Sequence, residues 1–117
     1  MTAKENFLRE FNRAFSENNI SFIRAHVSED IVWNMTGNRI IQGEEAFSAA
    51  LETMKSEDKF DLEIKHIITH GKIACVHGAM HSSDKTTYAF CDIYVFSNFK
   101  DLKIKELTSF VIQIKTQ

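Results

Sequence analysis

The segment Ser28–Phe47, SEDIVWNMTGNRIIQGEEAF, decides the fold because it reads as two short strands and the start of a helix in immediate succession. Ile31–Met35 has the composition of a short strand, and Thr36–Asn38 contains the Gly and Asn that favour a turn. Arg39–Gln42 then forms the second strand. Gly43 opens a helix whose first turn carries two glutamates, where negative side chains interact favourably with the helix dipole.

Two further helices are predicted upstream of this segment. Between Lys4 and Asn18 the apolar residues recur with the period of one helical stripe. Asn18 and Asn19 are expected to end this helix, since Asn tolerates the left-handed backbone that follows many helices. Ser21 is placed to cap a short second helix. The stripe consists of Phe7, Leu8, Phe11, Ala14 and Phe15, and the second helix carries Phe22, Ile23 and Val27.

Downstream of the segment the pattern changes to strands. Alternation of apolar and charged residues begins at Phe60 and slips near Ile67, which indicates a bulge or a bend. Three more strands follow, at Ile73–Ser82, Thr86–Ser97 and Lys103–Lys115. Helices that precede an antiparallel meander of four strands are typical of the α+β class.

The composition limits the partners that the protein can have. A formal net charge of -2 attracts neither a nucleic acid nor an anionic membrane surface, so no partner of either kind is expected. No apolar run reaches the length of a transmembrane helix, and Met1–Glu10 lacks the apolar core of a signal peptide. Cys75 and Cys91 lie in strand-like apolar runs and are expected to be reduced thiols of a cytoplasmic protein. One domain over residues 1–117 is expected.

Neither a metal nor a cofactor is predicted. His66 and His70, like His77 and His81, are four residues apart, which on a strand separates the side chains by roughly 13 Å. That separation is too large for two ligands of one ion. The chain has no Gly-rich phosphate loop, no nucleophile elbow and no Cys-x-x-Cys motif. Its ten Phe residues supply large flat side chains that build a core or line a cavity for a small apolar molecule.

Three segments together resemble the nuclear-transport-factor-2-like (NTF2-like) superfamily, in its SnoaL or polyketide-cyclase-like branch with the ketosteroid-isomerase-like fold. They are the leading helix that ends in SENN, the segment from SEDIVWNMTG to IIQGEEAF, and FCDIYVF followed by a hairpin and LKIKELTSF. The resemblance implies a cone-like α+β barrel, in which three N-terminal helices pack on a curved antiparallel sheet around an apolar pocket. The superfamily includes cyclases, isomerases, epoxide hydrolases, dehydratases and simple binding modules, so the fold alone does not give the function.

Asp92 is the most informative candidate for a site residue. Every neighbour at a spacing of two along its strand is aromatic, and a carboxylate among aromatic rings is costly unless it is paired or protonated. In ketosteroid isomerases a similar stretch carries a neutral acid that donates a hydrogen bond to the substrate oxyanion. The alternative is that Asp92 only accepts structural hydrogen bonds. The aromatic neighbours are Tyr88, Phe90, Tyr94 and Phe96.

His77 is the candidate partner of Asp92. If the odd residues of its strand face inward, as the resemblance favours, His77 lies opposite Asp92, whereas a slip of one residue puts Val76 there. A buried His–Asp pair is a plausible general acid and base. The alternative for His77 is a core histidine with its hydrogen bonds satisfied.

The last strand is predicted to turn its even residues inward. On this prediction Glu106, Thr108 and Phe110 contact the substrate, together with Trp33 at the pocket rim and Phe11, Phe90 and Tyr94. The opposite face of the sheet would form a homodimer, because a convex face must be covered. Leu107, Val111, Val76 and Met80 are the residues expected in that contact.

Two functions remain open on this evidence. The first is a binding module for a small apolar molecule. The second is a pocket enzyme of isomerase, lyase (cyclase) or hydrolase type, in which Asp92 and His77 transfer protons on a small carbonyl or hydroxyl compound. The resemblance speaks against steroid isomerisation, since Asn34 or Met35 stands where that family has its base and Phe11 where it has a Tyr.

Overall fold

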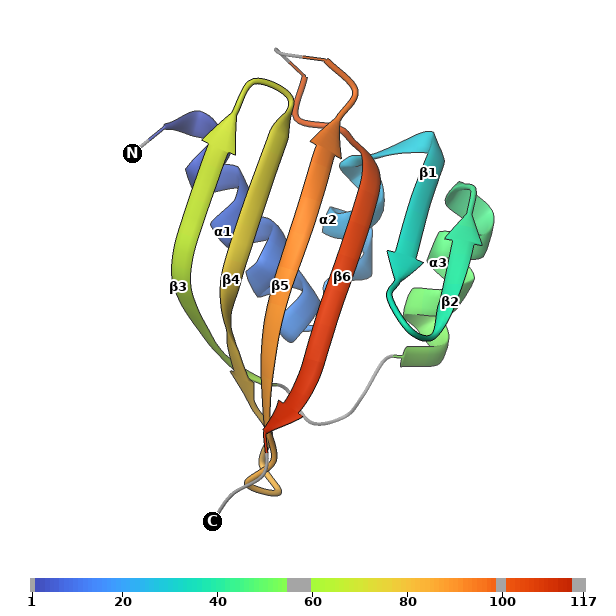
Figure 1. The fold of residues 1–117 in the computed structure, drawn as a ribbon. Helices are drawn as coiled ribbons and strands as arrows, with labels where there is room; N and C mark the ends of the chain where they lie inside the picture. The colour runs from blue at the N-terminus through green and yellow to red at the C-terminus, as the bar shows by residue number, and fades with distance from the viewer. Residues whose placement is uncertain (1, 55–59, 99–100, 115–117) are drawn as a thin grey trace.

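Three helices lie on one side of a six-stranded sheet in the computed structural model, which describes residues 2–54, 60–98 and 101–114 (Figure 1). This arrangement confirms the α+β class and the packing of three N-terminal helices on a curved, mostly antiparallel sheet that the sequence predicts. In chain order the elements are α1 (Ala3–Ser16), α2 (Ile20–Ala25), β1 (Val27–Met35), β2 (Arg39–Gln42), α3 (Glu44–Met54), β3 (Asp61–His70), β4 (Ile73–His81), β5 (Thr87–Phe96) and β6 (Ile104–Ile114).

The helix ends follow from local side-chain chemistry. Thr2 caps α1, because its hydroxyl accepts a hydrogen bond from the backbone N–H of Glu5 at 3.1 Å. Asn18 follows α1 with φ at 59°, the left-handed conformation expected of it. The prediction that Ser21 caps α2 is wrong. Asn19 does so, accepting a hydrogen bond from the N–H of Phe22 at 3.3 Å, and Ser21 lies inside the helix.

The strands form a sheet in the order β2-β1-β6-β5-β4-β3. Strands β3 to β6 are the predicted antiparallel meander, and β1 adds to β6 as the parallel pair of an otherwise antiparallel sheet. Strand β1 starts at Val27, earlier than predicted, with a register shift between Val27 and Val32. A register shift of this kind bends a sheet, and the sheet curves around α1 and α2 (Figure 1).

Strand β3 carries a bulge where it pairs with β4. The register shifts between Ile64 and His66, close to the slip that the sequence pattern places near Ile67. Gly78 of β4 pairs with Ile64, and a Cβ at Gly78 would lie 2.2 Å from the carbonyl oxygen of Glu63. Only glycine allows the two backbones to come this close.

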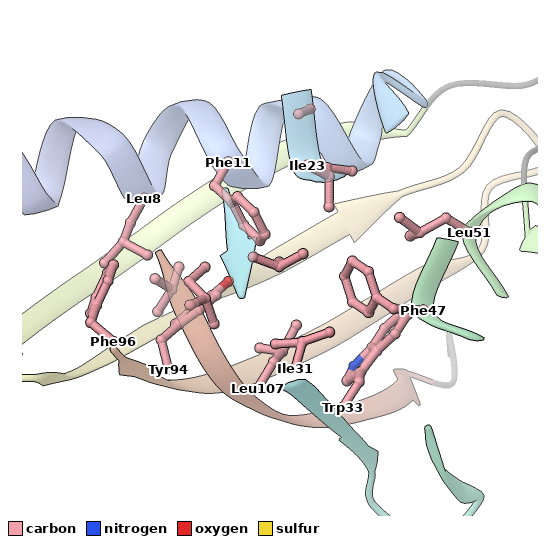
Figure 2. Close-up of a cluster of buried hydrophobic side chains, with 14 of the residues drawn as sticks. Leu8, Phe11, Ile23, Ile31, Trp33, Phe47, Leu51, Tyr94, Phe96 and Leu107 are labelled. Carbon is pink, nitrogen blue, oxygen red and sulfur yellow. The ribbon is translucent and has the colours of Figure 1, made fainter. Parts of the chain in front are cut away.

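The core fills the space between the helices and the concave face of the sheet. Leu8 and Phe11 of α1 point toward Phe96 and Tyr94 of β5, and all four side chains are buried (Figure 2). Trp33 of β1 continues this core toward α3. On the inner face of β5, Tyr94 and Phe96 therefore belong to the packed core, whereas Asp92 lies next to it on the same strand.

Candidate functional site

A cavity of about 450 Å³ lies between the helices and the inner face of the sheet. Its volume falls within the range of small-molecule sites in proteins. Helices α1 and α2 cover it on one side, and strands β1, β5 and β6 form the opposite wall. Most of the lining is apolar, and the polar side chains in it are Asn12, Ser16, Asn18, Thr36, Asn38, Tyr88, Asp92 and Ser109.

Asp92 is the acid in this cavity. Alternation along β5 turns Tyr88, Phe90 and Asp92 to the inner face, as the sequence predicts. Asp92 keeps a partly exposed edge, but its Oδ1 atom is buried and has no hydrogen-bond partner among the described residues. Burial raises the pKa of Asp92 to about 7, although hydrogen bonds from the hydroxyls of Ser109 and Tyr94 lower it in part. The carboxyl group is therefore divided between its neutral and charged forms at neutral pH.

Tyr94 and Asn12 hold the other oxygen of Asp92. The hydroxyl of Tyr94 donates to Oδ2 of Asp92 at 3.4 Å, and it accepts from Nδ2 of Asn12 at 3.0 Å. The same amide nitrogen donates to the carbonyl of Leu8 at 2.8 Å, which fixes the Asn12 side chain against its own helix. Burial raises the pKa of Tyr94 well above its usual value, so its hydroxyl stays a donor. This chain leaves Oδ1 as the free oxygen of Asp92.

Trp33 and Ser109 form a second polar contact in the cavity wall. The indole Nε1 of Trp33 donates to Oγ of Ser109 at 3.0 Å, and Ser109 pairs directly with Asp92 across β5 and β6. The prediction that Trp33 lies at the pocket rim is wrong. It lines the cavity, but only 4% of it is exposed because the rings of Phe15 and Phe47 pack against it at 5.8 and 5.3 Å.

Two other aromatic predictions also change. Phe90 lines the cavity, but Phe11 and Tyr94 lie behind the wall, fully buried among other rings. Phe11 packs edge-on against Tyr94 at 6.0 Å between ring centroids. These two side chains support the site from the core instead of contacting a molecule inside it.

The prediction that His77 faces Asp92 is wrong. Strand β4 pairs Val76 with Asp92 and His77 with Cys91, so the one-residue slip weighed in the sequence is the one that occurs. His77 is exposed on the outer face, where its ring stacks on that of His66 with 3.2 Å between the two Nδ1 atoms. Ala74 and Gly78 are buried with Val76, and at Gly78 the close approach of β3 leaves no room for a Cβ.

The face prediction for the last strand is wrong as well. The register shifts between Val95 and Phe96, so that β6 takes one extra residue, Lys105, between Ile104 and Glu106. Beyond this bulge the odd residues turn inward, and Leu107, Ser109 and Val111 line the cavity. Glu106, Thr108 and Phe110 face outward instead.

The expected dimer contact changes in consequence. Leu107, Val76 and Met80 lie on the inner face, and Val111 lines the cavity, so none of the four belongs to the outer surface named for them. The outer face carries a different apolar group, in which each side chain is at least a third exposed. We call it the outer apolar group; its members are Ile68, Ile73, Ile93, Phe110 and Ile112.

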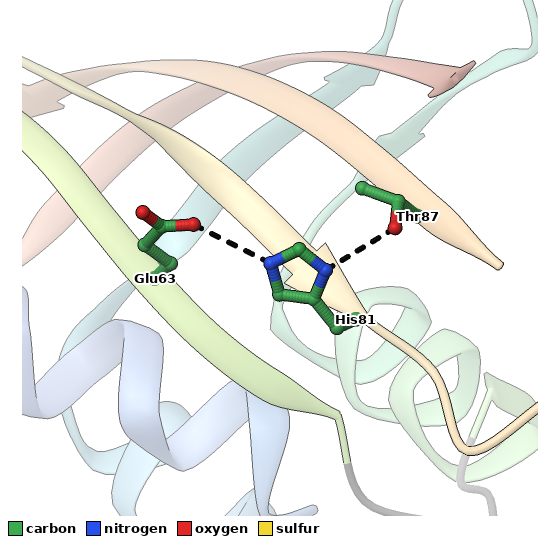
Figure 3. A network of polar contacts seen from close by, with 3 residues as sticks. All are labelled: Glu63, His81 and Thr87. Carbon is green, nitrogen blue, oxygen red and sulfur yellow. Dashed lines mark hydrogen bonds and ion pairs between the residues drawn. The ribbon is translucent and has the colours of Figure 1, made fainter. Parts of the chain in front are cut away.

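A polar network lies on the same outer face. His81 bridges Glu63 of β3 and Thr87 of β5 at 3.4 and 3.2 Å (Figure 3). The side chains of His81 and Glu63 are about half exposed, so this contact adds little to stability. In the described part of the chain, no group of three or more His, Cys, Asp or Glu residues is arranged to hold a metal ion. No helix within that part is long and apolar enough to cross a membrane.

Sequence reasoning missed Asn12 and placed Ser109 on the wrong face. Asn12 is four residues after Leu8 on α1 and three before Phe15, so it interrupts the apolar stripe with a polar side chain. A buried amide in such a stripe requires a hydrogen-bond partner across the core, and that requirement was the available signal.

Comparison with known proteins supports the fold. The SnoaL-like domain family matches residues 8–107. A putative SnoaL-like polyketide cyclase from Shewanella denitrificans is 13% identical with a TM-score of 0.83, over 96% of this chain and 92% of that one. An NTF2-like protein of unknown function from Cytophaga hutchinsonii is 22% identical with a TM-score of 0.73, over 94% of this chain and 100% of that one. An LEH-like epoxide hydrolase from M. tuberculosis is 16% identical with a TM-score of 0.74, over 92% of this chain and 80% of that one. No curated protein matches the chain.

Proposed function

The chain belongs to the SnoaL-like domain family, and from this premise we propose that it binds a small, largely apolar molecule with a carbonyl or hydroxyl group. The observation that carries the proposal is the free Oδ1 atom of Asp92, buried in the wall of an apolar cavity. A buried polar atom without a partner is costly, and a ligand group that bonds to it removes that cost. The apolar lining supplies the rest of the binding energy.

The protonation of Asp92 decides which polar group it recognises. With its pKa at about 7, the neutral acid donates a hydrogen bond to a carbonyl oxygen, whereas the carboxylate accepts one from a hydroxyl. Both forms are populated at neutral pH. The hydroxyl of Tyr94 bonds to the other oxygen of the acid from the protein side, which supports a fixed direction for Oδ1.

Titration with decan-2-one, followed by the fluorescence of Trp33, tests the proposal. Trp33 is the only tryptophan and lines the cavity, so its emission reports on occupancy. At pH 6 the native protein should bind this ketone. Asp30→Asn is the matched control for Asp92→Asn. Asp30 is an exposed acid on β1, so its removal should leave the affinity for the ketone unchanged. No fluorescence change up to the solubility limit of the ketone, and no binding by calorimetry, would refute the proposal.

One observation also favours a catalytic role. A carboxyl with a pKa near 7 is matched to general acid–base chemistry at neutral pH. Among the described lining residues Asp92 is the one carboxylate, and His77 lies outside, so a reaction here would use Asp92 alone to remove and return a proton. Exchange of the α-protons of decan-2-one with deuterated water tests this. Equal rates with the native protein and Asp92→Asn would leave binding as the function.

We also propose that the outer apolar group covers itself by pairing with a second copy of the chain. Its members Ile68 and Ile112 are 65% and 68% exposed, and Phe110 is 41% exposed. Large side chains exposed together on one face favour association, and a symmetric pair covers both copies at once.

A further inference from the structure

A second hollow of about 420 Å³ lies beside the cavity, between α1 and β3. The two elements pack against one another along the edge of the sheet (Figure 1). Ser16, Phe60 and Leu62 line both the hollow and the cavity, so the two spaces share a wall. In contrast to the cavity, the hollow is lined by charged side chains. We call it the arginine groove, and its charged residues are Arg9, Arg13, Glu17 and Asp61.

The two arginines of this groove lie one helical turn apart on α1. Arg9 is half-buried, and its Nε is buried without a hydrogen-bond partner among the described residues. No ion pair within the described part of the chain involves the guanidinium group of Arg9 or of Arg13. A guanidinium group presents donors in a planar fork that fits a carboxylate. The groove thus offers an unmet donor of the kind that binds an anion.

The acidic residues of the groove restrict the anion. Glu17 and Asp61 are exposed and are not paired with the arginines in the described structure. With Arg9 and Arg13 they bring the formal charge of the groove to zero, so the groove has no excess positive charge that would attract a dianion such as phosphate. A carboxylate needs only one guanidinium group as its partner, which makes it the anion that fits this groove.

We propose that the arginine groove holds the carboxylate of an amphipathic ligand whose apolar body lies in the neighbouring cavity. The shared wall of Ser16, Phe60 and Leu62 is where such a ligand passes from one space to the other. This inference rests on the proposed function and specifies its ligand class as an aliphatic carboxylic acid. Arg9 binds the carboxylate with its guanidinium group, whose Nε has no partner in the described structure, and Arg13 supplies a second cation one turn further along α1.

The test compares decanoate with decan-1-ol at pH 8, by calorimetry, on the native protein, Arg9→Gln and Arg39→Gln. The two probes share an alkyl chain and differ in charge. Arg39 is exposed on β2, at the opposite edge of the sheet from β3, so Arg39→Gln makes the same charge change outside the groove. Arg9→Gln should weaken decanoate about tenfold or more, the usual effect of losing a charge-assisted hydrogen bond. Binding of decan-1-ol should not change.

The outcomes separate this inference from the proposed function. If decan-1-ol binds but Arg9→Gln weakens decanoate no more than Arg39→Gln does, the arginine groove is not a carboxylate site, while the apolar cavity keeps its role. If Arg9→Gln weakens both probes equally, Arg9 acts only on the fold, and the inference is again overturned. If neither probe binds the native protein, the cavity fails as a binding site, and this inference fails with it. Arg9→Lys should restore decanoate only in part, because ammonium keeps the charge but not the fork.

Discussion

Replacement of Asp92 by Asn should make the protein more stable at pH 8 and remove part of its pH dependence. Because the folded state raises the pKa of Asp92 from 3.8 to about 7, folding holds a proton that the unfolded chain releases. The native protein is therefore free of this penalty below about pH 4 and loses stability as the pH rises toward 7. At 1.36 kcal/mol per pKa unit the full loss is about 4 kcal/mol, of which about 3 kcal/mol falls between pH 5 and pH 8.

The Asn variant gives up part of this gain. An amide fits the hydrogen bonds of the neutral acid less well, which costs about 1 kcal/mol at every pH. The hydrogen bonds that favour the carboxylate are already included in the raised pKa of about 7. The net effect at pH 8 is therefore a stabilisation of about 3 kcal/mol, and near pH 4 the variant should be the less stable protein. Desolvation of the carboxylate thus outweighs its hydrogen bonds only where it is ionised.

Urea unfolding at pH 5, 6.5 and 8 measures this difference directly. All other acids titrate alike in both proteins, so the difference between the two free energies of unfolding isolates Asp92. Asp30→Asn, at an exposed position, should show no gain at pH 8. The reasoning is refuted if the difference between native protein and Asp92→Asn stays constant with pH, or if the variant is the less stable protein at pH 8.

Three further predictions follow from packing. Acrylamide should quench the fluorescence of Trp33 only weakly in the ligand-free protein, since only 4% of the residue is exposed; strong quenching would contradict this burial and indicate a position at the pocket rim. Gly78→Ala should lower the melting temperature by about 10 °C or more, or prevent folding, because the Cβ of the alanine would lie 2.2 Å from the Glu63 carbonyl oxygen. A change of a few degrees would contradict the close approach of the β3 backbone to Gly78. Phe110→Glu should give monomers by sedimentation at micromolar concentration, whereas Met54→Glu, on α3, should not; a native monomer would contradict the pairing.

The sequence was sufficient for the order of the elements and for the inner face of β5. On β5 the contrast is large, since Tyr88, Phe90, Tyr94 and Phe96 all alternate with smaller residues. That contrast brought Asp92 into the predicted site, and the structure keeps it there.

The faces of β4 and β6 were not predictable from the same pattern. On β4 both alternations are similarly apolar, with Ile73 and Cys75 on one side and Val76 and Met80 on the other. On β6 the bulge at Lys105 reverses which residues face inward, and no turn residue in the sequence marks it. The positions of His77, Glu106 and Thr108 depended on these two choices.

The arginine groove was also invisible before the fold was known. Arg9 and Arg13 share a face of α1, but their role depends on β3 lying beside that face. Phe60 and Leu62, which connect the groove to the cavity, come from the middle of the sequence, far from Arg9 and Arg13 along the chain. Only the packing of α1 against β3 brings these residues together.

The pH dependence of decan-2-one binding tests the central claim, that Asp92 recognises a ligand through its free oxygen, most directly. A ketone only accepts hydrogen bonds, so it binds the neutral acid. With the pKa at about 7, the neutral fraction falls about tenfold between pH 6 and pH 8, and the affinity should fall by about the same factor. Asp92→Asn, whose amide donates at every pH, should bind the ketone with an affinity that does not change over this range. A native affinity that is constant from pH 6 to pH 8, or an equal fall in Asp92→Asn, would contradict the claim.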